Sequence, residues 1–264
     1  MAGDLFEINH SKVQAYFRCK KQYWFEYVSG IQKPADPMSP AGIVGKGVHR
    51  AMQVLCETDS EELGRGELNR YLRMPEHIAC SEGTEWFELA HTFYSNGVEF
   101  HNQLDTPPDR RWAEKQTWRP QKEAGINVSS RLDRADQIGE KRWQIIDWKT
   151  GRFDPDNVTD AQLDLAHVAL RTSFRAALKE DHTVRAVAIN LRRGGETRVR
   201  ELVAADAADT VAYYVTVARQ IQANTNWLAT PGRFCSICKW RPQCPEGSDD
   251  DDRLDPSDVE DADE

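Results

Sequence analysis

Residues 145–151 read Ile145-Ile146-Asp147-Trp148-Lys149-Thr150-Gly151, and this stretch decides the fold. Its leading β-branched residues favour a strand, which the final Thr-Gly pair would end. Side chains two residues apart point to the same face of a strand, so Asp147 and Lys149 are expected side by side. An aspartate can ligate a hard divalent cation, and a lysine beside it can orient a water or neutralise charge on a phosphate. The pattern therefore predicts the core of a metal-dependent phosphodiesterase site.

A second carboxylate strengthens this interpretation, because Asp-x-Lys alone also occurs on ordinary exposed strand edges. Asp133 lies fourteen residues upstream of Asp147. Residues 137–142 between them include Gly139 and several polar residues, which is typical of a hairpin connection. Two antiparallel strands joined there would bring the two aspartates together. Two carboxylates and a lysine would form a site for one or two divalent ions.

With these residues the chain resembles the RecB-like branch of the PD-(D/E)XK nucleases. In that branch a segment like Arg131–Asp136 precedes a strand like Ile146–Gly151, a histidine lies upstream of both, and a glutamine lies on the following helix. The resemblance places His49 at the histidine position and Gln162 at the glutamine position. The tyrosine that usually follows this glutamine is replaced by Ala166 and His167.

The resemblance implies a metal-dependent DNA nuclease, and within that class an exonuclease acting on single-stranded or frayed ends. It implies a site for Mg²⁺ or Mn²⁺ whose ligands are two carboxylates, an imidazole and a backbone carbonyl: Asp133, Asp147, His49 and Trp148. An imidazole among oxygen ligands suits Mn²⁺. Lys149 would orient the attacking water and Gln162 would position the substrate or Lys149. CRISPR adaptation, phage recombination and DNA repair, with their proteins as partners, are all open as settings.

Three late cysteines form a second constellation, Cys235, Cys238 and Cys244, with the spacing Cys-x2-Cys-x5-Cys. Thiols so close together in a cytoplasmic protein are typical of metal ligands rather than of disulfides. A closed zinc site or a four-iron cluster needs a fourth ligand, which this segment lacks. Cys19 is the best donor, whereas Cys56 and Cys80 are interpreted as ordinary buried thiols. Spacing alone leaves zinc and iron equally open.

The same resemblance favours iron. RecB-like nucleases with an iron–sulfur cluster, among them the CRISPR-associated exonucleases and the nuclease domain of a bacterial recombination helicase–nuclease subunit, carry one early cysteine and a late Cys-x2-Cys-x5-Cys. All four positions match here and bracket the nuclease motifs. The resemblance thus implies a structural [4Fe-4S] cluster that closes a very long loop between Cys19 and residues 235–244. Two other classes stay open, a non-catalytic DNA-binding or assembly module with such a cluster and a zinc-stabilised regulator.

The remaining pattern predicts the fold class. Helices are expected over residues 11–28, 42–57, 158–179 and 206–228 and through much of 59–105, and strands over 111–119, 126–133, 142–149, 184–191 and 197–203. With the resemblance, this order predicts an α/β fold whose PD-(D/E)XK restriction-endonuclease-like core is a mixed central sheet flanked by helices. A helical N-terminal part and a C-terminal iron–sulfur segment would complete it. Glu114 is interpreted as an exposed strand acid, with a further carboxylate near the metal as the alternative. Five further histidines are interpreted as ordinary surface or core residues: His10, His77, His91, His101 and His182.

Composition bounds the location and the partners. The chain is 39% hydrophobic, no apolar run approaches the ~20 residues that span a bilayer, and the N-terminus lacks a signal-peptide pattern. We therefore expect a cytoplasmic protein with no membrane partner. The net charge of −9 is local, because residues 246–264 hold 11 acids and 1 base while the preceding 245 residues hold 33 bases and 32 acids. This predicts one domain over residues 1–245 and a disordered acidic tail over 246–264. The alternative is a tail that competes with DNA for a basic groove.

Overall fold

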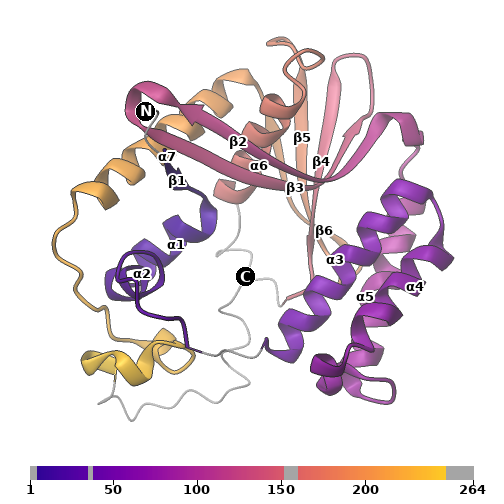
Figure 1. The fold of residues 1–264 in the computed structure, drawn as a ribbon. Helices are drawn as coiled ribbons and strands as arrows, with labels where there is room; N and C mark the ends of the chain where they lie inside the picture. The colour runs from indigo at the N-terminus through magenta and orange to yellow at the C-terminus, as the bar shows by residue number, and fades with distance from the viewer. Residues whose placement is uncertain (1–4, 35–37, 152–159, 248–264) are drawn as a thin grey trace. The chain divides into compact units, whose positions relative to one another are not determined.

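The structure is a computed structural model that describes residues 5–34, 38–151 and 160–247. The chain divides into two compact units (Figure 1). We call residues 38–119 and 129–211 the central unit, and residues 1–37, 120–128 and 212–264 the terminal unit. The single domain expected over residues 1–245 stays a prediction, and most of the acidic tail, from residue 248 onward, lies outside the described residues.

A mixed sheet forms the centre of the central unit. Its strands are β2 (Arg111–Gln121), β3 (Ile126–Gln137), β4 (Arg142–Lys149), β5 (Thr183–Asn190) and β6 (Gly195–Leu202). The order is β3-β4-β5-β6, and β2 pairs with β3. The pairs β3–β4 and β5–β6 are antiparallel, whereas β4 and β5 are parallel. The β3–β4 pair confirms the hairpin predicted over residues 137–142. Gly194, with φ at +68°, supplies the left-handed residue that the β5–β6 turn requires.

Helices cover both faces of this sheet. The helices α3 (Pro40–Thr58), α4 (Glu61–Leu72) and α5 (Glu85–Asn102) gather together in Figure 1. Their apolar side chains form one buried cluster with Ile146 and Trp148 of β4. The intervening residue Ile145 belongs to a second cluster, which includes α6 (Asp160–Ser173). Because alternate residues of a strand face opposite sides, these two clusters place helices on the two faces of the sheet. The predicted mixed sheet flanked by helices is confirmed.

The terminal unit is built from separate parts of the chain. It holds β1 (Phe6–Ile8), α1 (His10–Arg18), α2 (Lys20–Tyr27) and the last part of α7 (Ala204–Ala223). The short strand β1 was not predicted, and it pairs in parallel with residues 126–128. The single helix predicted over residues 11–28 is wrong. It breaks at Cys19, whose backbone is extended and whose Sγ caps α2 by accepting a hydrogen bond from the Gln22 amide.

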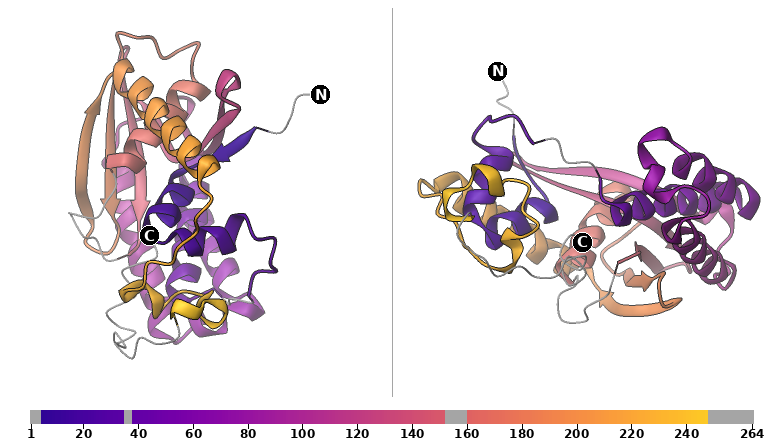
Figure 2. Two further views of the ribbon diagram at one scale, coloured as in Figure 1. Left: turned by 90° about the vertical axis from the view of Figure 1, so that its left-hand side faces the viewer. Right: turned by 90° about the horizontal axis from the view of Figure 1, so that it is seen from below.

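Aromatic stacking holds the C-terminal residues of the terminal unit against α2. Tyr23 stacks on Trp227 with ring centroids 5.9 Å apart, and Phe25 stacks on the fully buried Trp240 at 5.2 Å. The Trp240 indole also donates to Glu26 Oε2 over 2.9 Å. Both views in Figure 2 show the C-terminal described residues, in yellow, beside the indigo helices α1 and α2.

Short 3-10 turns complete the described chain, at Pro75–Cys80, Pro108–Arg110, Lys122–Ala124, Arg233–Cys235, Arg241–Gln243 and Pro245–Gly247. No helix in the described part of the chain is long and apolar enough to cross a membrane.

Candidate active site

The end of β4 presents the aspartate and the lysine as the sequence predicts. The Lys149 ammonium lies 3.1 Å from Asp147 Oδ2 and donates to Gln162 Oε1 over 2.9 Å. The Gln162 amide in turn donates to Asp147 Oδ1 over 3.3 Å. The glutamine comes from the first turn of α6, which covers the face of β4 that carries both other side chains. The three side chains therefore form a closed triangle that fixes the position of the lysine.

The β3–β4 hairpin brings the second aspartate to the same place. Arg134 pairs with Ile146, so extending the register by one residue sets Asp133 opposite Asp147. The Asp133 carboxylate accepts a hydrogen bond from the Trp148 amide over 2.9 Å. The role predicted for the Trp148 carbonyl as a cation ligand stays a prediction.

His49 and a third carboxylate, that of Glu114, complete the group. His49 Nδ1 lies 3.5 Å from Asp133 Oδ2 and 4.0 Å from Glu114 Oε1. In the described residues, these three form the one group of His, Cys, Asp or Glu side chains whose ligand atoms all lie within 4.8 Å of one another. A helix (α3) and two strands (β2 and β3) thus each contribute one ligand.

The interpretation of Glu114 as an exposed strand acid is wrong. Its side chain is 8% exposed, and Arg131 Nε donates a hydrogen bond to its carboxylate. Its φ of +49° is left-handed, a conformation that costs a non-glycine residue of the order of 1–3 kcal/mol and that often marks a functional site. A signal was present in the sequence, because Glu114 is two residues after Trp112 and would share its inward face on a regular strand.

The electrostatics show a site that needs positive charge. Burial by itself lowers the pKa of His49, but the charges of Asp133, Glu114 and Asp147 outweigh burial and raise the pKa to about 9. Burial raises the pKa of Asp147 and of Glu114. Burial also acts to raise the pKa of Asp133, yet the neighbouring His49 imidazolium holds it below its usual value. Three carboxylates crowded around one histidine are stabilised by a cation.

The donor set fits a divalent metal ion. The buried Oδ2 of Asp147 accepts no hydrogen bond, although it lies 3.1 Å from the Lys149 ammonium. Oxygen ligands suit Mg²⁺ and Mn²⁺, and an imidazole among them suits a transition metal. His49, Glu114 and Asp133 could therefore hold such an ion, with Asp147 beside them.

The terminal unit brings the four predicted cysteines together. Cys19, Cys235, Cys238 and Cys244 all line one pocket of about 470 Å³, a volume that includes space open to solvent. The amides of Gln22 and Thr230 donate to Cys19 Sγ over 3.5 and 3.4 Å. Burial raises the pKa of the Cys238 thiol, and the other three cysteines raise it further.

The other two cysteines behave as ordinary thiols. Cys56 and Cys80 are buried in the central unit, and neither lines the cysteine pocket, as the sequence predicts.

The five histidines interpreted as ordinary residues have hydrogen-bonding or packing roles in the described structure. His101 proves to be part of a buried charge network. His167, at the position of the missing tyrosine, is fully buried and accepts a hydrogen bond from Arg171 Nε over 2.7 Å.

Comparison with solved structures finds distant likenesses. A protein named "Putative exonuclease" from Eubacterium rectale has 11% identity and a TM-score of 0.48, covering 83% of this chain and 80% of its own. A protein named SSO0001 has 15% identity and a TM-score of 0.35, covering 86% of this chain and 95% of its own. No assignment rests on these scores.

Comparison with curated proteins finds no match. Comparison with protein families matches residues 7–245, a span that includes His49, Glu114, Asp133, Asp147, Lys149 and the four pocket cysteines. Nucleases of the matched family use divalent metal ions, in agreement with the His49, Glu114 and Asp133 group. On this match, the chain belongs to the PD-(D/E)XK nuclease superfamily.

Proposed function

We propose that the central unit cleaves DNA at a divalent-metal site formed by His49, Glu114, Asp133 and Asp147. The observation that carries this proposal is the convergence of His49, Glu114 and Asp133 within 4.8 Å, from three different elements. The closed triangle of Asp147, Lys149 and Gln162 lies at the end of the strand paired with β3. Burying several charged side chains together is costly, and such clusters are typical of functional sites rather than of purely structural sheets.

The residues of the chain have distinct roles in this proposal. Bound Mg²⁺ or Mn²⁺ would polarise the scissile phosphate and lower the pKa of a bound water. Lys149 would neutralise negative charge that develops on the phosphate and orient the attacking water. Gln162 holds the Lys149 ammonium and the Asp147 carboxylate in register, so it acts as a positioning residue.

Two salt bridges support the placement of Gln162. Asp160, two residues before it, accepts from Arg198 Nε and Nη2 over 2.8 Å each. Asp164, two residues after it, lies 3.0 Å from Arg200 Nη2. The first turn of α6 is thus held to the edge strand β6 on both sides of the glutamine.

We also propose that the enzyme acts as an exonuclease on single-stranded or frayed DNA ends, in recombination, repair or CRISPR adaptation. Support comes from the resemblance of residues 131–136 and 146–151 to the RecB-like branch. The assay below, with label at either end of the DNA, gives the direction of degradation. The neighbouring genes give the candidate partner proteins.

We propose further that Cys19, Cys235, Cys238 and Cys244 hold a [4Fe-4S] cluster. Their convergence on one pocket supports a four-sulfur site. A tetrahedral zinc ion would suit four thiolates equally. Iron is favoured by the resemblance of one early cysteine and a late Cys-x2-Cys-x5-Cys to the RecB-like nucleases with an iron–sulfur cluster. Amide hydrogen bonds to Cys19 Sγ are of the kind that tune such clusters.

Cleavage of end-labelled DNA tests the nuclease proposal. With Mg²⁺ or Mn²⁺ the protein should shorten end-labelled single strands, and Lys149→Ala should slow cleavage about 10³-fold, as expected for loss of one transition-state contact. Lys141→Ala is the matched control, because Lys141 is an exposed lysine of the same unit, paired with Asp181.

Cleavage by the Lys149→Ala protein at the wild-type rate would show that the site is misassigned. If the wild-type protein binds DNA without cleaving it under any divalent cation, the function is instead that of a DNA-binding or assembly module.

A further inference from the structure

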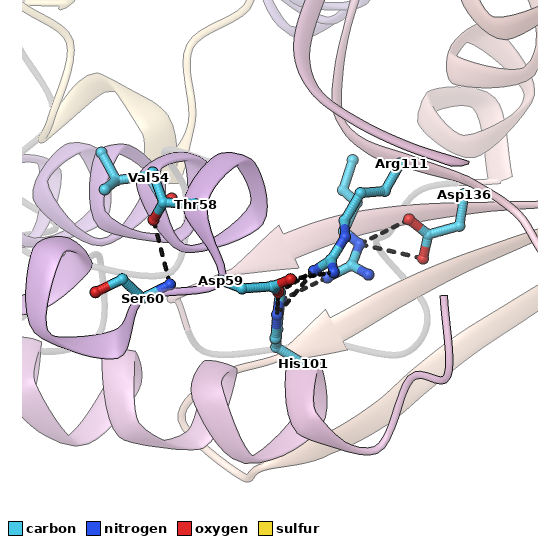
Figure 3. Close-up of polar contacts among 8 residues, drawn as sticks. Val54, Thr58, Asp59, Ser60, His101, Arg111 and Asp136 are labelled. Atoms are coloured by element: carbon cyan, nitrogen blue, oxygen red, sulfur yellow. Dashed lines mark hydrogen bonds and ion pairs between the residues drawn. The ribbon is translucent and has the colours of Figure 1, made fainter. Parts of the chain in front are cut away.

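A buried charge network spans four elements of the central unit (Figure 3). Its members are two arginines, two aspartates and a histidine: Asp59, His101, Arg111, Arg134 and Asp136. The side chains of Arg134 and Asp136 are 1% and 0% exposed, and those of His101 and Arg111 are each 6% exposed. Only the Asp59 side chain, at 42%, reaches solvent substantially within this group.

His101 is the bridge between two ion pairs. Arg111 donates to the Asp59 carboxylate through two guanidinium nitrogens, with Nη2 2.6 Å from Oδ2. Arg134 Nε donates to both oxygens of Asp136 over 2.9 and 3.1 Å. Arg134 Nη1 also lies 2.8 Å from His101 Nδ1, so this nitrogen must accept. His101 Nε2 lies 3.0 Å from Asp59 Oδ1 and also 3.0 Å from Arg111 Nη1. The proton is placed on Nε2 because the Asp59 carboxylate beside it can accept, whereas Nδ1 faces only the Arg134 donor.

A neutral histidine suits this bridge. Burial and the nearby Arg134 charge both lower the pKa of His101. Two cations and two anions then balance around an uncharged ring. The network is well satisfied, apart from Arg111 Nε and Arg134 Nη2, which have no partner.

The network joins the same three elements that carry the cation ligands. Asp59 directly follows the last residue of α3, the helix of His49. Arg111 is the first residue of β2, three residues before Glu114. Arg134 directly follows Asp133 on β3. The fourth element, α5, contributes His101 as the link between Asp59 and Arg134.

We propose that this network positions His49, Glu114 and Asp133 and thereby sets the affinity of the site for its divalent cation, an inference that rests on the proposed function. Buried, paired charges resist displacement, because moving one partner leaves another uncompensated in a low-dielectric interior. Replacing residues that hydrogen-bond directly to metal ligands typically changes metal affinity 10- to 100-fold. This network acts through the backbone of α3, β2 and β3, so the lower end of that range is expected. His101 is a positioning residue in this proposal and has no contact with substrate.

Calorimetric titration of the full chain with Mn²⁺ tests the proposal. His101→Leu removes both hydrogen bonds and should weaken Mn²⁺ binding by at least about tenfold. His101→Gln offers an oxygen acceptor to Arg134 and an N–H donor to Asp59, so it should stay within about threefold of wild type. Leu170→Ala is the control, because Leu170 is fully buried in the cluster on the α6 side and should lower stability without changing Mn²⁺ affinity.

The outcomes separate the network from general stability. Wild-type Mn²⁺ affinity in folded His101→Leu, or an equal loss in Leu170→Ala, would overturn the proposal. Should His101→Leu fail to fold, Asp59→Asn gives a milder test, since it keeps the shape and removes one charge at the most exposed member. It should weaken Mn²⁺ binding, and unchanged affinity would overturn the proposal. A wild-type protein that binds no divalent cation would instead contradict the proposed function itself.

Discussion

Apart from the acidic stretch 248–264, the two units of this chain carry opposite formal charge. Without that stretch the terminal unit has ten lysines and arginines against six acids, a net of +4. The central unit has 23 bases against 27 acids, a net of −4. The candidate cation site thus lies in a unit of negative charge, and the four cysteines lie in a part of the chain that is positive without its tail. The difference teaches that a proposed phosphodiesterase site and the positive charge that would attract a polyanion can belong to different parts of one chain.

The units also differ in how their candidate sites are constructed. Ligands in the central unit come from a long helix and two strands that pack into an extensive aliphatic core. Cys19 instead lies at a break between two short helices, and Cys235 in a three-residue 3-10 turn. The central site should therefore keep its shape without a cation, whereas the cysteine site should depend on its cluster for order.

The largest effect should follow from breaking the cysteine site. Anaerobically purified protein should be brown and hold about four irons, and Cys19→Ala should lose that iron as fully as Cys238→Ala. A cross-link between residues 19 and 235 closes a loop of some 216 residues, which the chain-entropy model values at about 5 kcal/mol. Iron content and thermal unfolding measure the two losses.

Matched cysteine variants serve as controls. Cys56→Ala and Cys80→Ala should keep the iron, because neither residue lines the pocket. Cys19→Ala should retain Mn²⁺ binding in the central unit. A brown Cys19→Ala protein with full iron content would refute the long-range bridge, and zinc in anaerobic protein would refute iron but keep the four-cysteine site.

The second-largest effect should be a loss of stability of the central unit at acid pH. Burial lowers the pKa of His167 to about 4, whereas an unfolded chain has a histidine pKa near 6.5. Between pH 6.5 and about 4, His167 is protonated in the unfolded state but stays neutral in the folded state. The free energy of unfolding should therefore fall by up to about 3 kcal/mol as the pH drops from about 6.5 to about 4.

Hydrogen exchange measured by mass spectrometry in α6 and β4 gives this free energy for the central unit alone. His167→Gln cannot titrate and should flatten the acid loss. His10→Gln in the terminal unit is the control, since His10 Nδ1 lies 3.2 Å from the Tyr214 hydroxyl at a partly buried position. Equal acid sensitivity of wild type and His167→Gln would assign the loss to other groups.

The smallest effect should come from removing the acidic tail. Truncation before Asp249 deletes most of a local charge of −10 and leaves the rest of the terminal unit with a net charge of +4. If the tail screens that unit, DNA binding should tighten by about threefold near 50 mM salt and less at 200 mM. Fluorescence anisotropy with labelled single-stranded DNA measures it. A full-length variant with neutral amides in the tail should behave like the truncation, and constant affinity across the salt series would show that the tail does not screen.

Local pattern was enough to place strands β2 to β6 and the hairpin that sets Asp133 opposite Asp147. The alternation around Ile146 and the turn at Gly139 are short-range features, and the antiparallel register follows from them. The two-helix break at Cys19 was missed, because an apolar-periodic segment gives no sign that a cysteine will cap a helix.

The left-handed backbone at Glu114 and the charge network were beyond local reasoning for a different reason. The left-handed backbone at Glu114 is imposed by the surrounding structure and not by its residue type. The pair of Asp59 with Arg111 joins residues 52 apart, and that of His101 with Arg134 joins residues 33 apart. Such pairs depend on how α3, α5 and the sheet pack, which no spacing rule encodes.

The pocket that unites Cys19 with Cys235, Cys238 and Cys244 also sets an order of events during synthesis. At about 5–20 residues per second, the ribosome needs roughly 10–40 s after Cys19 to reach Cys235. Residues 38–211, which contain the whole central unit, emerge within that interval and can fold first. A nascent chain can therefore assemble its candidate active site before the partners of Cys19 have been synthesised, and completion of the cysteine pocket comes last.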